Sequence, residues 1–271
     1  MSLAKSILAV LVLSVGLSAR AQYAAKVTLN TGHSFVVKQL NIQGDRLYPE
    51  SDQASTSVAS IRDVEFRFAG INLKLCETMF SSGDRKSLES LLAQYVGPVV
   101  QYSYLPTNLG DYLVWQLRAQ YWNNNRSGLA KSIGLLRKMD AASQRDAANL
   151  YYVLALMDRG RLDDAKTVFT MVLKPDAVSV PMTEYIRGRL AVEGGDYRQA
   201  MQHVSKVIAF HSRDPEWMPP ATALEARVYQ ETGQLQKAET VANELMIAYP
   251  GTRWSALGEQ IKKKTTGTRG G

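Results

Sequence analysis

The sequence is poor in the residues on which most enzymes and metal proteins depend. Its 271 residues include one cysteine, Cys76, and three histidines, His33, His203 and His211. One cysteine excludes an intramolecular disulfide bond, and we expect Cys76 to be a buried small residue in a helix. No cysteine or carboxylate stands at metal-ligand spacing from the histidines, and the chain has no HExxH, GxSxG, P-loop or dinucleotide-binding glycine motif. We therefore expect a protein that is not an enzyme, with no catalytic residues, no metal and no cofactor.

Long apolar runs are also lacking. The apolar stretch 7–17 covers only about half of a bilayer span. It follows Lys5 and precedes Ala19, Arg20 and Ala21, which fit the small-residue rule for leader cleavage before Gln22. Residues 1–21 are therefore predicted to be a secretory signal, with an uncleaved membrane anchor as the alternative. Because Cys76 is too far from this leader to be a lipid-bearing cysteine, we expect an exported, periplasmic bacterial protein associated with the cell envelope.

Acidic residues are outnumbered by basic ones, 25 to 32, which gives a net charge of +7. The charges are dispersed except at Lys262, Lys263, Lys264 and Arg269. The segment 262–271 is rich in Thr and Gly, and we predict a disordered tail over 265–271. A basic tail can contact nucleic acid or anionic lipid, but in an exported protein we interpret it as a solvated terminus.

Residues 22–68 have the pattern of a small β-rich domain. Short segments with the composition of strands, at 27–29 and 34–37, flank a turn at Gly32, and a second turn at Gly44 precedes further short alternating segments. Four or five short strands predict a strongly curved antiparallel sheet or barrel. A sheet of this size has a thin core, so we expect it to pack on the first helical hairpin.

From residue 69 onward the apolar spacing is helical, and one pattern recurs. An apolar helix leads to a turn glycine, and an alanine follows that glycine by five residues. The glycine and alanine pairs are Gly160 and Ala165, Gly195 and Ala200, and Gly233 and Ala238. Glycine permits the left-handed backbone that ends a helix tightly, and alanine lets two helices cross closely.

This repeat of about 36 residues resembles the tetratricopeptide-repeat family, whose period is about 34 residues. Phe169, Gly188 and Pro250 match further family positions, namely the large residue of the second helix, the small residue of the first helix and the closing proline. Gly188 has its counterpart in Ala226 of the next repeat.

Two segments upstream carry weaker versions of the pattern. Residues 111–140 place Asn125 at the turn and Ala130 at the packing position, and residues 70–95 place Gly83 and Leu88 there. A final amphipathic helix at 254–262 serves as a cap. The resemblance thus implies a mainly α fold, an α-α superhelix of about five helical hairpins and a capping helix over 69–264, preceded by the small antiparallel β-domain.

The resemblance also implies where partners bind. In this family the first helix of each pair lines a concave groove that holds peptides or protein segments. When the family's groove positions are transferred to the same places in each repeat of this chain, the groove residues are Tyr112, Trp122, Met157, Tyr185, Arg189, Arg227 and Gln230. Trp115, Leu150 and Leu154 share the groove phase, but we expect them to pack between repeats. For Arg189 and Arg227 a solvated helix face is the alternative.

These features give two functional hypotheses. The first is a non-enzymatic scaffold of the periplasm or cell envelope that mediates protein–protein interactions through its concave groove, with an envelope protein as partner and no small-molecule substrate. The alternative is a module that binds an envelope polymer or nucleic acid with its basic surface and β-domain. The alternative predicts an affinity that falls steeply with salt.

Overall fold

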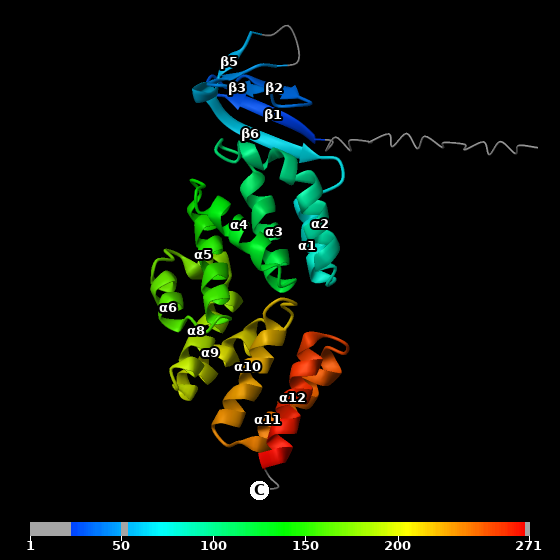
Figure 1. Cartoon of the computed structure of the whole chain (residues 1–271), viewed down its shortest axis with the longest axis vertical. Coiled ribbons are helices and arrows are strands. Elements are labelled where there is room, and N and C mark those ends of the chain that lie inside the picture. The colour runs from blue at the N-terminus through cyan, green and yellow to red at the C-terminus, as the bar shows by residue number, and fades with distance from the viewer. Residues whose placement is uncertain (1–22, 50–53, 269–271) are drawn as a thin grey trace, which may run out of the picture.

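The computed structural model describes residues 23–49 and 54–268, except for the side chains of 266–268. The predicted signal, residues 1–21, and the last residues of the predicted tail lie outside this part of the chain. Figure 1 shows a β region at one end of a long, curved array of helices whose last helix lies at the other end. No helix within the described ranges is long and apolar enough to cross a membrane.

The β region contains two small antiparallel sheets. The first has the strand order β2-β1-β6 and the second the order β3-β4-β5. Their strands are β1 (Tyr23–Leu29), β2 (Ser34–Val37), β3 (Ile42–Gln43), β4 (Arg46–Leu47), β5 (Thr56–Ser57) and β6 (Ile61–Phe68). The predicted small antiparallel β-domain and its β1–β2 hairpin are confirmed, but the strands divide between two sheets and do not form the one curved sheet or barrel that was expected. Gly44, at φ 62°, folds β3 back onto β4, so these two-residue strands pair with each other and do not extend the first sheet.

The helices form consecutive packed pairs, α1 with α2, α3 with α4, α5 with α6, α8 with α9, and α10 with α11. The last helix, α12, packs on α11. Their bounds are α1 (Leu73–Ser81), α2 (Arg85–Tyr95), α3 (Leu109–Trp122), α4 (Arg126–Leu136), α5 (Ala142–Met157), α6 (Leu162–Thr170), α7 (Pro175–Val178), α8 (Val180–Glu193), α9 (Tyr197–Phe210), α10 (Met218–Glu231), α11 (Leu235–Ala248) and α12 (Arg253–Thr268). The predicted mainly α fold of helical hairpins with a capping helix is confirmed.

Each hairpin turns at a residue with a left-handed backbone. Gly83, Gly160, Gly195 and Gly233 have φ values of 85°, 71°, 78° and 73°, and in the second hairpin Asn124 has φ 57°. The prediction that placed this turn at Asn125 is therefore wrong by one residue. Asn125 is the N-cap of α4, and its side chain accepts a hydrogen bond from the backbone N–H of Gly128 at 2.9 Å. Asparagine suits both roles, so the run of asparagines in the sequence does not fix the register.

The packing position lies five residues after each turn residue. Ala165, Ala200 and Ala238 are fully buried there, as predicted. In the second hairpin the corrected register makes Leu129 the buried residue and leaves Ala130 exposed. The larger side chain of Leu129 thus occupies the crossing of α3 and α4, as Leu88 does for the first hairpin.

The β region and the first helices share one hydrophobic core. The ring of Phe68, at the end of β6, meets the ring of Tyr112 edge-on at 5.1 Å and that of Tyr95 at 6.4 Å. The Asn108 side chain forms two hydrogen bonds with the backbone of Phe66. Its oxygen accepts from the Phe66 N–H at 2.9 Å, and its nitrogen donates to the Phe66 C=O at 3.0 Å. The predicted packing of the β region on the first hairpin is confirmed, and the segment before α3 adds a second attachment.

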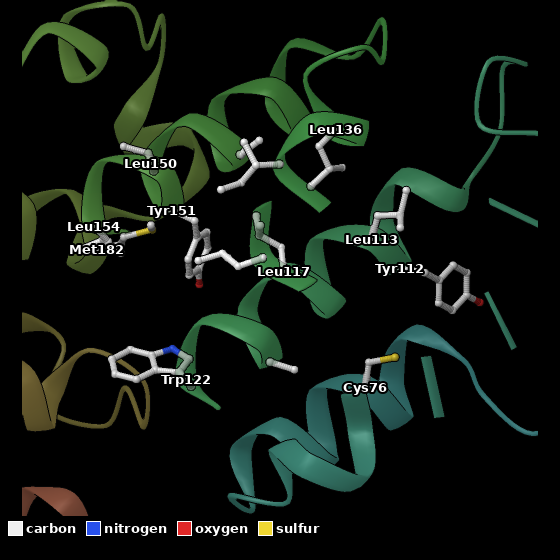
Figure 2. Close-up of a cluster of buried hydrophobic side chains, with 14 of the residues drawn as sticks. Cys76, Tyr112, Leu113, Leu117, Trp122, Leu136, Leu150, Tyr151, Leu154 and Met182 are labelled. Carbon is white, nitrogen blue, oxygen red and sulfur yellow. The ribbon is translucent and has the colours of Figure 1, made fainter. Parts of the chain in front are cut away.

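Figure 2 shows the interior where α1, α3 and α5 meet, with Cys76 among the buried side chains. Burial raises the pKa of the Cys76 thiol to about 11, so this residue acts as a small apolar side chain, as predicted. Leu150 and Leu154 are fully buried and Trp115 packs against Phe80 at 5.6 Å, which confirms that they pack between repeats.

Helix α12 extends past its predicted end at Lys262. Ile261 and Thr265 are buried on its inner face, and the Thr265 hydroxyl donates to the Ile261 carbonyl at 3.1 Å. Residues 265–268, which were predicted to belong to the disordered tail, therefore lie in this helix. The apolar contacts of one helix face outweigh the Thr- and Gly-rich composition on which the tail prediction was based.

Candidate functional site

The structure divides the seven predicted groove residues into two groups. The first group is buried in the interior and consists of Tyr112, Trp122 and Met157. The second group lines one open pocket and consists of Tyr185, Arg189, Arg227 and Gln230. Of the predicted groove residues, only those in the last two hairpins thus lie around one common surface.

This C-terminal pocket lies between α8, α10 and α12 and has a volume of about 300 Å³. Its apolar wall consists of Pro220, Ala223, Leu224, Trp254, Leu257 and Ile261. Gln230, Glu231, Gln260 and Lys264 add polar groups. The pocket therefore combines an apolar surface with hydrogen-bonding and charged side chains, which is the usual composition of a recognition site.

Two arginines of the pocket are held by acidic residues of the preceding repeat. The Arg189 guanidinium donates to Asp158 and the Arg227 guanidinium donates to Glu193, both at 2.7 Å. Arg189 has a side chain only 17% exposed, whereas Arg227 is 41% exposed. Although burial disfavours its charge, Tyr185 and Asp158 raise the pKa of Arg189 above its ordinary value. Arg189 is therefore a largely buried cation in the pocket wall, and Arg227 is the more exposed of the two arginines and can contact a ligand.

Upstream of the pocket, a carboxylate from the link between α9 and α10 is buried against α3 and α5. Glu216 has a side chain 4% exposed and accepts hydrogen bonds from the Arg118 guanidinium at 2.6 Å, the Trp122 indole N–H at 2.7 Å and the Tyr151 hydroxyl at 2.6 Å. Figure 2 shows the hydroxyl of Tyr151, on α5, directed toward Trp122 at the end of α3. We call these four residues the Glu216 cluster. Burial raises the pKa of the Tyr151 hydroxyl well above its ordinary value, so Tyr151 remains a hydrogen-bond donor.

The residues 211–217, between α9 and α10, present Glu216 to the earlier helices. The Asp214 carboxylate accepts from the backbone N–H groups of Glu216 and Trp217 at 2.8 and 2.9 Å, which fixes the turn before α10. The fully buried Trp217 contacts the rings of Trp122 and Tyr185 at 5.4 and 5.6 Å. This link therefore fastens the last two hairpins onto α3 and α5.

Side chains from the second helix and from the last helix also meet at Trp122. The Arg85 guanidinium of α2 lies 5.2 Å from its ring centroid and that of Arg253, from α12, lies at 4.4 Å. The Trp254 ring contacts it at 6.0 Å. Burial lowers the pKa of Arg85, whose buried Nε has no hydrogen-bond partner among the described residues. Trp122 is thus covered from both sides and does not face an open groove.

Reasoning from the sequence missed Glu216. It lies in a proline-containing link between repeats, where an acidic residue is expected to face solvent. The available signal was its neighbour Trp217, because a tryptophan in a connecting segment must bury its large ring somewhere. The three donors come from helices far away in the sequence, and no local spacing points to them.

A second buried carboxylate joins α8 to α9. Glu184 accepts from Arg187 at 2.8 Å, from the Nδ1 of His203 at 2.7 Å and from Lys206 at 3.2 Å. Although burial disfavours its charge, these hydrogen bonds hold the pKa of Glu184 below its ordinary value. His203 therefore belongs to a structural ion cluster between two helices.

The other histidines lie apart from this cluster. His33 is exposed at the end of the β1–β2 hairpin, and His211 ends α9. Within residues 23–49 and 54–268, no three histidine, cysteine or acidic side chains are grouped so as to hold a metal ion.

Comparisons of the chain with protein-family models, curated proteins and solved structures find no match. What the C-terminal pocket binds is therefore inferred from its own residues and geometry.

Proposed function

We propose that the protein is a binding module of tetratricopeptide-like repeats that holds a segment of a partner protein in the C-terminal pocket. The observation that carries this proposal is the convergence of Tyr185, Arg189, Arg227 and Gln230 on one open pocket. The repeat phase of the sequence alone predicts these four positions as groove residues.

The Glu216 cluster limits where the partner can bind. Glu216 and Trp217 of the chain itself occupy the space between α3 and α5 where Trp122 and Tyr151 meet. We therefore place the partner segment at the open pocket between α8, α10 and α12.

The pocket suits one or two side chains of a peptide. Its volume of about 300 Å³ is at the lower end of small-molecule sites. An apolar side chain of the partner would bury surface against Leu224 and Leu257, while Arg227 and Gln230 supply hydrogen bonds to its backbone or polar groups. Burial of an apolar anchor beside arginine is typical of interface hot spots.

The proposed setting is the bacterial periplasm or cell envelope. It rests on the leader-like residues 1–21 and on the repeat pattern, and it makes the partner an exported protein. The proposed role is that of a scaffold without catalytic activity of its own.

Site-specific photocrosslinking tests the proposal. A benzoylphenylalanine at Gln260, an exposed residue of the pocket, is compared with one at Gln236, an exposed glutamine on α11 outside the pocket. We expect a crosslink from position 260 to one defined partner segment, mapped by mass spectrometry, and none to this segment from position 236. Crosslinks to the same segment from both positions, or from neither, would argue against binding in the pocket.

A further inference from the structure

A second recessed surface lies between α4 and α5, outside the C-terminal pocket. It has a volume of about 210 Å³ and carries three arginines, Arg126, Arg137 and Arg159. Between them the surface consists of Tyr152 and of small or apolar residues, among them Ala130 and Gly134. We call this surface the arginine groove.

The arginines stand at the two ends of the groove. Arg126 and Arg137 are separated by three turns of α4, and a rise of 1.5 Å per residue places them about 16 Å apart along the helix. Arg159 follows the end of α5 and shares a neighbouring pocket with Arg126. The groove therefore has two cations at one end, one at the other, and a narrow uncharged floor between them.

These cations are available to a ligand. The Nε of Arg137 donates to the Asn149 side chain at 2.8 Å, and its guanidinium lies 4.4 Å from the centroid of the Tyr152 ring. Neither Arg126 nor Arg159 forms an ion pair or a side-chain hydrogen bond with any residue that the structure describes. None of the described residues lining the groove is acidic, and Asp158, in the neighbouring pocket, is paired with Arg189.

We propose that the arginine groove binds an extended acidic peptide segment of a protein partner, with one carboxylate at each end of the groove. An extended chain rises about 3.3 Å per residue and places every second side chain on the same face, so two carboxylates four residues apart face the groove together and span about 13 Å. The flexible arginine and glutamate side chains cover the remaining distance to the two ends of the groove. Arginine binds carboxylates through paired hydrogen bonds. The small side chains of Ala130 and Gly134 leave room for the backbone between the two carboxylates.

A nucleic acid fits this surface less well. Each strand of a duplex carries a phosphate about every 3.4 Å along the helix axis, and the centre of the groove offers Ala130, Gly134 and Ile133 where phosphates would need cations. The inference does not depend on the C-terminal pocket, since it concerns other helices and other residues.

The test uses the full chain and a fluorescein-labelled peptide of five residues, with glutamate at both ends and alanine between. Fluorescence anisotropy compares the wild-type protein with the double variant Arg126→Gln, Arg159→Gln. The matched control is Arg198→Gln, Arg213→Gln, which removes the same charge from two exposed arginines elsewhere. Circular dichroism checks that all three proteins fold alike.

We expect binding to the wild-type protein and the control variant, at least fivefold weaker binding to the groove variant, and loss of binding when glutamine replaces both glutamates. Four outcomes would overturn the inference. They are no binding to the wild-type protein, equal weakening in both variants, equal binding of the glutamine peptide, or groove-dependent binding of a single-stranded oligonucleotide in place of the peptide.

Discussion

The carboxylate of Glu216 accepts a hydrogen bond from the guanidinium of Arg118 at 2.6 Å, across 98 positions of the sequence. Arg118 belongs to α3, in the second hairpin, and Glu216 precedes α10, in the fifth. Most contacts in a helical repeat array join neighbouring repeats. This pair joins distant ones, so it holds the link before α10 against α3.

Replacing Glu216 is therefore expected to destabilise the whole helical array. Glu216→Ala leaves the mostly buried Arg118, 26% exposed, without its counter-charge, and we expect a loss of about 3 kcal/mol in the free energy of unfolding. Glu216→Gln keeps the shape and should cost about 1.5 kcal/mol. Urea unfolding measures both, with Glu259→Gln on the exposed face of α12 as control. A loss in Glu216→Ala no larger than that of the control would contradict the role of the pair.

The corrected register of the second hairpin predicts opposite behaviour at two adjacent asparagines. Asn124 has a left-handed backbone, so Asn124→Gly should leave the free energy of unfolding unchanged or raise it by about 0.5 kcal/mol. Asn125 caps α4, and Asn125→Ala should lower it by about 1 kcal/mol. Thermal or urea unfolding distinguishes them. The register is wrong if Asn124→Gly destabilises the protein by 1 kcal/mol or more.

Two helical glycines should respond differently to the same substitution. A Cβ at Gly258 would lie 2.7 Å from the carbonyl oxygen of Ala242, whereas one at Gly134 meets nothing within 4 Å. Gly258→Ala should therefore push α12 away from α11 and cost about 1–3 kcal/mol. Gly134→Ala should stabilise by about 0.5–1 kcal/mol, because alanine is the better helix former.

The same glycine pair gives a structural readout. Loosening of α12 in Gly258→Ala should appear as faster proteolysis after Lys262, Lys263 or Lys264, with no change in Gly134→Ala. Equal stabilisation by both substitutions would mean that α12 does not approach α11 as closely as described.

The buried Glu184 predicts a specific dependence on pH. Its pKa lies below the value of 4.5 expected when unfolded, since His203, Lys206 and Arg187 stabilise the carboxylate. The stabilisation is thus fully present above pH 4.5 and is lost as the pH falls through the lower, folded-state pKa. The difference in free energy of unfolding between the wild-type protein and Glu184→Gln should be largest near neutral pH and shrink below pH 4.5. A difference that stays constant from pH 7 to pH 3 would contradict this.

The repeat architecture could be predicted from the sequence because its determinants are local. Gly160, Gly195 and Gly233 are needed for the backbone angle of a turn, and Ala165 and Ala200 for a close helix crossing. Each requirement falls on one residue at a fixed offset, so the pattern is visible without the structure. Where two adjacent residues satisfy the same requirement, as with Asn124 and Asn125, the pattern loses its register.

The site was only partly predictable because it depends on how the array closes. Helix phase predicted Tyr185, Arg189 and Arg227 as residues of one surface, and in the structure all three line the C-terminal pocket. The same phase placed Trp122 in the groove, where Trp217 and Trp254 now cover it. Trp122 is covered by segments far apart from it in the sequence. Such contacts produce no periodic pattern of residues, so the sequence alone does not reveal them.

Binding of a partner segment in the C-terminal pocket is the central claim, and calorimetry tests it most directly. The segment found by crosslinking from position 260 is synthesised and titrated into the wild-type protein, Arg227→Ala and the matched control Arg198→Ala, an exposed arginine of α9. We expect the affinity to fall at least tenfold for Arg227→Ala and to stay unchanged for Arg198→Ala. Equal affinity of all three proteins for the segment would contradict the assignment of the pocket.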